Sequence, residues 1–315
     1  MSTRKKHVTP SRPGPFHVAW DIETAPLPEA LADALAETDP IRQLLDSGAE
    51  CTVDAVEAAT ERIRAATEKG WRYGRTKDAE ILRAKLSEDM GDAVRKVSRD
   101  MSFNPASCMI VSAAFAGRHP STGRVLGEVR TLNDVDGDER KLVEWQWACL
   151  QSADRIVTHN GADFDARVLL LRSAALGIAP PISLSTRRGS HNPLTDTLLV
   201  VTGGDRSLNA KKGNGLDAVC RRYGVGVGKG GMDGSKVAGL VDEGRWDEIA
   251  QYNLGDVIDR TLPLYEHLLT ALIREDESHL RYWEWLKGLR AAGIAAPHAG
   301  TNYQPVSTAG FGMVA

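Results

Sequence analysis

Hydrophobic and polar residues alternate over Phe16–Thr24, and this alternation predicts a β-strand. Bulky apolar side chains fall on one face of the strand, whereas Asp21 and Glu23 share the opposite face with Ala19. Two carboxylates on one face interrupt the pattern of an otherwise buried strand. This face is therefore the first candidate for chemistry.

Apolar residues at helical spacing follow the strand, in a segment rich in Ala, Glu, Asp, Arg and Lys. We interpret this segment, about residues 26–100, as a helical insertion rather than an independent enzyme. Residues 1–15 are expected to form a flexible basic arm, and residues 293–315 a flexible tail rich in small side chains. The main domain is expected to span residues 16–292 and to contain the insertion.

The sequence pattern in the rest of the main domain predicts alternating strands and helices. Further strands are expected at Cys108–Gly117, Gly127–Leu132 and Arg155–His159. Helices are expected at Arg140–Ala153, Phe164–Leu176 and Gly215–Tyr223. A last long helix is expected from about Trp246 to Leu272, with an interruption near Pro263.

Composition narrows the class of protein only slightly. The 315 residues include 42% hydrophobic residues, enough for a real core, and 39 Lys and Arg against 42 Asp and Glu. This balance excludes a histone-like polycation and leaves room for a local basic stripe. The four cysteines are scattered, which predicts a reduced, cytoplasmic protein without zinc or a disulfide framework. Because no apolar stretch approaches the roughly 18 residues of a membrane span, we expect neither a membrane span nor a secretory signal.

Two further acidic positions add to the pair on the first strand. Asp165 lies directly after a predicted strand, at the edge where open α/β sheets bind ligands. Asp256 shares a helix face with Tyr252, four residues earlier. Hard cations such as Mg²⁺ prefer oxygen ligands. If the four carboxylates converge, they could not all ionise unless metal charge compensated them.

Each candidate also has a plain structural interpretation. An Asp-x-Glu pair is often an exposed strand edge, and Asp165 could simply cap a helix. Tyr252 could be a packing aromatic on an amphipathic helix. Asp196 is interpreted as an ordinary strand or turn residue and is left out of the candidate site.

The order and spacing of three motifs resemble those of a known superfamily. The motifs are D-I-E-T at 21–24, H-N-x-x-x-F-D at 159–165 and Y-x-x-x-D at 252–256. Together they resemble the DEDD superfamily of 3′–5′ exonucleases, and Tyr252 resembles its DEDDy branch. The flanking sequence is similar to that of predicted exonucleases related to family-B DNA polymerase proofreading domains, including a K-x-x-x-D-G-x-x-V segment at 229–237. The resemblance covers about residues 18–268.

The resemblance implies an α/β fold of the RNase H-like type, in which helices flank a central mixed five-stranded sheet and a helical insertion follows the first strand. It also implies two divalent ions, Mg²⁺ or Mn²⁺, held by Asp21, Glu23, Asp165 and Asp256. Tyr252, with a reference pKa of about 10, is assigned to orienting the nucleophilic water. Of the remaining candidates, Asn160 is expected to contact a substrate nucleotide or to fix the Asp165 loop, and Phe164 is expected to contact the substrate.

The leading hypothesis is a metal-dependent 3′–5′ exonuclease that acts on nucleic acid, with single-stranded DNA as the favoured substrate. It would work alone or as a proofreading partner of a DNA polymerase in trans. One alternative is an RNA-trimming exonuclease similar to RNase D, because the residues that read the 2′-hydroxyl are not evident from the sequence. A catalytically idle RNase H-like module that binds nucleic acid or a protein is a further alternative, although all four carboxylates are present.

Overall fold

The computed structural model describes residues 14–27, 100–184, 193–226, 232–272 and 276–294. Most of the expected basic arm, insertion and tail lies outside these residues. The described residues divide between two compact units. The larger holds those of 14–23, 110–236 and 240–294, and the smaller those of 24–109 and 237–239. Every candidate site residue belongs to the larger unit.

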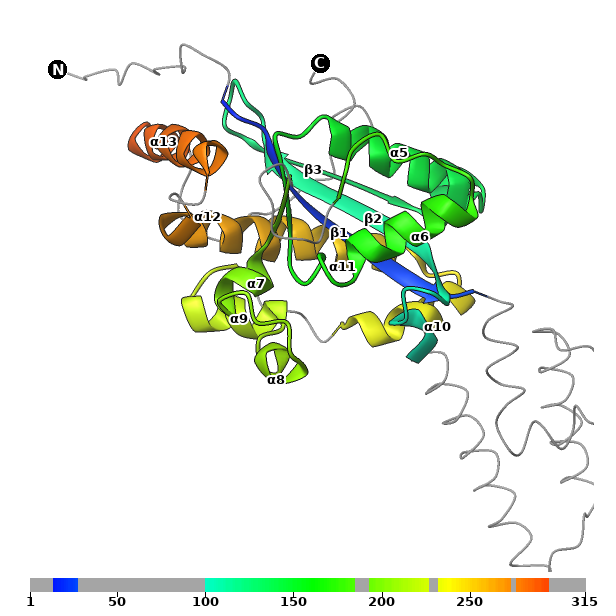
Figure 1. The fold of residues 1–315 in the computed structure, drawn as a ribbon. Coiled ribbons are helices and arrows are strands. Elements are labelled where there is room, and N and C mark those ends of the chain that lie inside the picture. The colour runs from blue at the N-terminus through cyan, green and yellow to red at the C-terminus, as the bar shows by residue number, and fades with distance from the viewer. Residues whose placement is uncertain (1–13, 28–99, 185–192, 227–231, 273–275, 295–315) are drawn as a thin grey trace, which may run out of the picture. The chain divides into compact units, whose positions relative to one another are not determined.

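A five-stranded mixed sheet runs through the fold in the order β3-β2-β1-β4-β5 (Figure 1). The strands are β1 (His17–Pro26), β2 (Cys108–Arg118), β3 (Val125–Thr131), β4 (Arg155–Thr158) and β5 (Leu194–Asp196). Strands β1, β4 and β5 are parallel neighbours, whereas β2 pairs antiparallel with β3. The Leu27 amide donates to the Ser107 carbonyl at 2.9 Å, so the end of β1 meets the start of β2.

Helices cover both faces of the sheet (Figure 1). Helices α5 and α6 lie on one face, and α11 and α12 lie on the other. The α-helices are α5 (Glu139–Gln151), α6 (Asp165–Ala175), α7 (Thr197–Val201), α8 (Leu208–Lys211), α9 (Leu216–Tyr223), α10 (Val237–Asp242), α11 (Trp246–Asp256), α12 (Leu262–Leu272) and α13 (Glu277–Ala291). Short 3₁₀ turns occur at Leu132–Val135 and Gly234–Lys236. The expected α/β fold, a mixed five-stranded sheet flanked by helices, is confirmed.

Small residues on the sheet allow α11 to approach it closely. Buried Ala19, Ala114 and Ala116 pack against apolar side chains at the end of α11 and just after it. Gly127 on β3 also lacks a side chain, so the Ile258 side chain packs directly against the strand. The buried Asn253 amide donates to the Ser112 hydroxyl at 3.0 Å. These contacts fix α11 over the face of β1 that carries Ala19.

The expected long helix differs from the structure in the position of its break. Helix α11 ends at Asp256, a π-turn occupies Val257–Thr261, and α12 begins at Leu262 without interruption at Pro263. A proline in a helix lacks an N–H donor and clashes with the carbonyl four residues earlier, here that of Asp259. The helix therefore widens in the turn before the proline. The amide of Leu262 bonds to the carbonyl of Val257, five residues back.

Helix α13 has no counterpart among the expected elements. It contacts the buried His17 of β1, whose Nε2 lies 2.9 Å from the hydroxyl of Ser278 on α13. The Nδ1 of His17 lies 2.7 Å from the hydroxyl of Tyr265 on α12. The His17 ring stacks on that of Tyr282, with 4.2 Å between centroids. Within the described segments, no helix combines the length and apolarity that crossing a bilayer requires.

Candidate active site

Strand β1 and helix α11 bring three carboxylates together. Side chains alternate along a strand, so Asp21 and Glu23 share the face of Ala19, which packs against the end of α11. Asp256 is the last residue of that helix. One carboxylate oxygen from each of the three residues lies within 4.8 Å of the others. The structure therefore brings three of the four candidate carboxylates together.

A buried arginine offsets part of the negative charge. Two like charges 4.8 Å apart repel each other by about 3.5 kcal/mol at an effective dielectric constant of about 20. Arg260 lies in the π-turn, and its Nη1 donates to the Oδ1 of Asp256 in an ion pair buried on both sides. Sequence reasoning missed Arg260, because an arginine four residues after an aspartate on a helix looks like an ordinary surface pair.

Tyr252 lies one helical turn before Asp256, and its hydroxyl hydrogen-bonds to that carboxylate. Its pKa lies well above the usual value for a phenol, chiefly because burial disfavours the phenolate. The nearby charges of Glu23, Asp256 and Asp21 raise it further. The phenol therefore keeps its proton at neutral pH, so it can donate a hydrogen bond but cannot act as a base.

Asp165 is buried at the first position of α6, outside the group of three carboxylates. Its Oδ1 accepts a hydrogen bond from the Ile22 amide at 3.1 Å, and Ile22 lies between Asp21 and Glu23 on β1. Burial raises the pKa of Asp165 to about 7 against two hydrogen bonds from backbone amides that lower it, and the Asp196 carboxylate raises it further. The role of Asp165 as a metal ligand stays a prediction.

The loop between β4 and α6 has a conformation that its sequence explains. Asn160 adopts a φ of 68°, the left-handed region that asparagine tolerates. A Cβ atom on Gly161 would lie 2.5 Å from that of Thr158, so the close return of the chain requires glycine. Asp196 accepts from the amides of Asn160 at 2.8 Å and Ala162 at 3.0 Å. Asp196 thus ends β5 and shapes the loop, as its interpretation as a strand or turn residue implies.

Both expected substrate contacts lie on this loop. The Oδ1 of Asn160 is buried, and no described residue bonds to it. Phe164 is half-buried and directly precedes α6. Between them, Asp163 forms ion pairs with Arg206 at 2.5 Å and Lys211 at 2.8 Å. Contact of Asn160 and Phe164 with a substrate stays a prediction.

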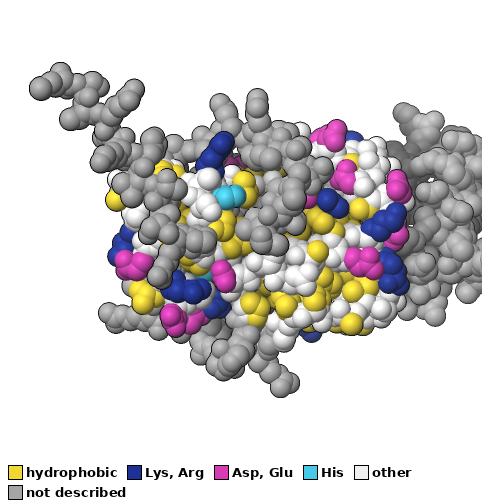
Figure 2. Space-filling view, turned by 90° about the horizontal axis from the view of Figure 1, so that it is seen from above, with side chains coloured by type: hydrophobic (Ala, Val, Ile, Leu, Met, Phe, Trp, Pro, Cys, Tyr) yellow, Lys and Arg dark blue, Asp and Glu magenta, His cyan; other side chains and the backbone are white. Residues whose placement is uncertain are grey.

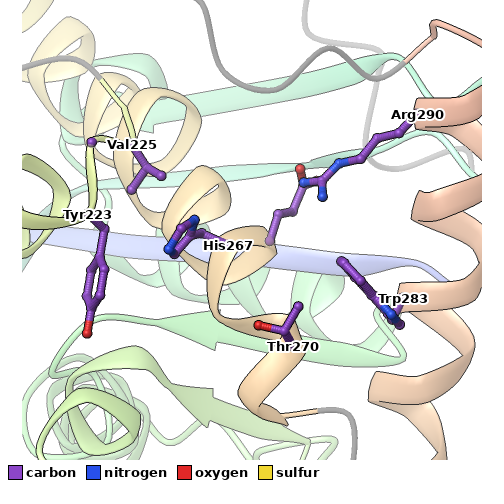
Figure 3. Close-up of a pocket in the computed structure, with 8 residues that line it drawn as sticks. Tyr223, Val225, His267, Thr270, Trp283 and Arg290 are labelled. Atoms are coloured by element: carbon purple, nitrogen blue, oxygen red, sulfur yellow. The ribbon is translucent and has the colours of Figure 1, made fainter.

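One face of the molecule and one cavity are the other candidate places for a functional site. On the face shown in Figure 2, the described basic and acidic side chains are interspersed rather than separated by sign. A cavity of about 410 Å³ lies between α9, α12 and α13 and contains none of the candidate residues. Figure 3 shows Tyr223, His267 and Trp283 around it. The carboxylate cluster, and not this cavity, is the candidate active site.

The donor set of the cluster suits a hard divalent cation. Each of Asp21, Glu23 and Asp256 offers a carboxylate oxygen, the ligand type that Mg²⁺ and Mn²⁺ prefer. Three oxygens leave coordination positions for water and phosphate, as magnesium sites usually do. The residues present therefore fit such an ion.

Comparison with known proteins adds a family match. A family model described as "Predicted 3'-5' exonuclease related to the exonuclease domain of PolB" matches residues 102–293, more than half of the chain. No curated protein matches the chain. Among solved structures, the family B DNA polymerase from the hyperthermophilic archaeon Pyrobaculum calidifontis is similar, with 17% identity and a TM-score of 0.45 over 93% of this chain and 31% of the polymerase. The chain thus spans about a third of the length of that polymerase.

Proposed function

Because this chain belongs to the family of predicted 3′–5′ exonucleases related to the exonuclease domain of PolB, we propose that it removes nucleotides from the 3′ end of nucleic acid by metal-dependent hydrolysis. The proposed substrate is single-stranded DNA. The observation that carries the proposal is the convergence of Asp21, Glu23 and Asp256 within 4.8 Å. These residues come from a strand and a helix more than 200 residues apart in sequence.

The cluster would hold two divalent ions, Mg²⁺ or Mn²⁺, which would lower the pKa of a bound water and stabilise the leaving 3′ oxygen. Asp21, Glu23 and Asp256 would bind them directly. Asp165 would complete the site through a water molecule, since its Oδ1 already accepts from the Ile22 amide.

The protein's other groups would orient the reactants. Tyr252 keeps its proton, which it donates to Asp256, and would orient the attacking water by accepting a hydrogen bond from it. Asn160 and Phe164 lie on the loop that leads to Asp165 and would contact the terminal nucleotide. The buried strand and helix would exclude water from the site, and these interactions would then be stronger than the same interactions in bulk water.

The test uses 5′-labelled single-stranded DNA and RNA oligonucleotides of one sequence, incubated with Mg²⁺, Mn²⁺ or EDTA. The expected result is a metal-dependent ladder that shortens from the 3′ end, faster on DNA than on RNA. Asp256→Asn should lower the rate by more than about 100-fold, beyond what the partners of metal ligands usually contribute. The matched control is Asp247→Asn, which changes an exposed aspartate at the other end of α11.

Other outcomes would point to different functions. Faster shortening of the RNA would favour an RNA-trimming enzyme. Retained binding without cleavage in any metal would favour a catalytically idle module. Equal rates for both aspartate variants would separate the activity from the carboxylate cluster and refute the proposed site.

A further inference from the structure

The π-turn at Val257–Thr261 joins the candidate metal site to a distant part of the chain. Single π-turns inside α-helices are rare and occur frequently at functional sites. This one directly follows Asp256 and contains Arg260, whose guanidinium is paired with the Asp256 carboxylate. Both side chains are buried, with 8% and 5% of their surface exposed. The pair is therefore shielded from water and from salt.

Two contacts, one from the last turn of α9 and one from the segment just after it, hold the π-turn. The Cys220 thiol donates to the Arg260 carbonyl at 3.8 Å. Gly226, with a φ of +72°, packs directly on the Asp259 carbonyl, because a Cβ atom there would lie only 2.2 Å from that oxygen. This carbonyl is the one that a regular helix would direct at Pro263, which has no N–H to offer. The backbone at Gly226 thus lies directly against the widened turn.

From this arrangement we propose that Arg260 is a positioning residue for Asp256, and that Gly226 keeps the π-turn in the shape this requires. Arg260 holds Oδ1 of Asp256 and so fixes the orientation of this carboxylate beside Asp21 and Glu23, where a divalent ion would bind. The inference rests on the proposed function, since it concerns the same metal site. It adds that ion affinity depends on a residue that does not touch the ion.

A simpler role for Arg260 gives the opposite result. If the guanidinium acted only as a counter-charge, its removal would leave the carboxylates more negative and would tighten cation binding. If it positions Asp256, its removal frees the ligand to rotate and weakens binding. Partners of metal ligands typically contribute about 10- to 100-fold in metal affinity.

The experiment measures Mn²⁺ binding by isothermal titration calorimetry in the absence of nucleic acid. Arg260→Met should weaken binding by about 10- to 100-fold, and Arg260→Lys, which keeps the charge but loses the forked geometry, should weaken it less. Gly226→Ala should weaken binding although it leaves every charge in place. The matched control is Gly224→Ala, because Gly224 has a φ of +64° but nothing within 4 Å of an added Cβ atom.

The two glycine variants share the cost of a left-handed alanine, so a difference between them isolates the contact with Asp259. Circular dichroism in EDTA identifies any variant that fails to fold, and the remaining variants then decide. Tighter binding by Arg260→Met, or equal binding by Gly226→Ala and Gly224→Ala, would overturn the inference. If the unaltered protein binds no Mn²⁺ and degrades no oligonucleotide, the proposed function itself fails.

Discussion

Replacing Asp165 by asparagine should stabilise the metal-free protein at alkaline pH. The carboxyl group is buried, and its pKa is raised from 3.8 to about 7, mainly by burial. Between these two pH values, the unfolded chain loses its proton while the folded protein keeps it. Stability therefore falls as the pH rises through this window, and above about pH 7 the folded protein carries a buried carboxylate at full cost.

The pKa difference sets the size of the effect. At 1.36 kcal/mol per pKa unit, a rise from 3.8 to about 7 corresponds to at most about 4 kcal/mol. Asparagine has nearly the same shape, carries no charge and can still accept from the Ile22 amide. The variant should thus gain about 2–4 kcal/mol over the unaltered protein at pH 8, and nothing at pH 4.

Urea unfolding in EDTA, followed by circular dichroism at pH 4, 6 and 8, measures this difference. Asp163→Asn is the control, since Asp163 lies in the same loop but is half-buried and paired with Arg206 and Lys211. It should lose less than about 1 kcal/mol at pH 8. A variant at Asp165 that is no more stable at pH 8, or whose gain is the same at pH 4, would refute the reasoning.

Three further predictions concern other buried groups. Tyr252→Phe should slow cleavage by about 10- to 100-fold by losing one hydrogen bond to a charged site, and initial rates of the unaltered enzyme should show no decline between pH 8 and 10 from phenol ionisation. Glu266→Gln should lower the unfolding free energy by about 3–5 kcal/mol, because it leaves buried Arg118 without the counter-charge that now lies 2.6 Å away; Mn²⁺ affinity, measured by calorimetry, should not change. Burial raises the pKa of the Cys149 thiol to about 12, so iodoacetamide at pH 8 should modify it only in urea, as peptide mass spectrometry would detect.

The sequence predicts the parts of the site that lie on regular elements. Alternation along β1 places Asp21 and Glu23 on one face, and the spacing of Tyr252 and Asp256 places both on one side of a helix. Both rules depend only on local backbone geometry. The proximity of the β1 and α11 residues, by contrast, depends on tertiary packing. Small residues such as Ala114 let α11 approach the sheet.

Two other features of the structure, the break in the long helix and the role of Asp196, could not be predicted from the local sequence pattern. Pro263 signals a break in the helix, but the strain is relieved upstream, by widening the turn that follows Asp256. Asp196 looks like any turn aspartate, and its bonds to the amides at 160 and 162 exist only once β4 and β5 pair. In both cases, the observed structure depends on contacts in the folded chain that the local sequence pattern does not predict.

The charges around the site explain how four carboxylates can be held near one strand before any metal binds. Asp165 retains its proton up to about pH 7, and Arg260 neutralises Asp256, so the folded protein does not hold four uncompensated anions. Folding and metal binding are then separate steps. Asp165 would have to lose its proton before its carboxylate could take part in binding an ion. The affinity for such an ion would therefore increase as the pH rises through 7. Arg260, by contrast, stays charged throughout the neutral pH range, so its pairing with Asp256 keeps this carboxylate in place without a metal ion.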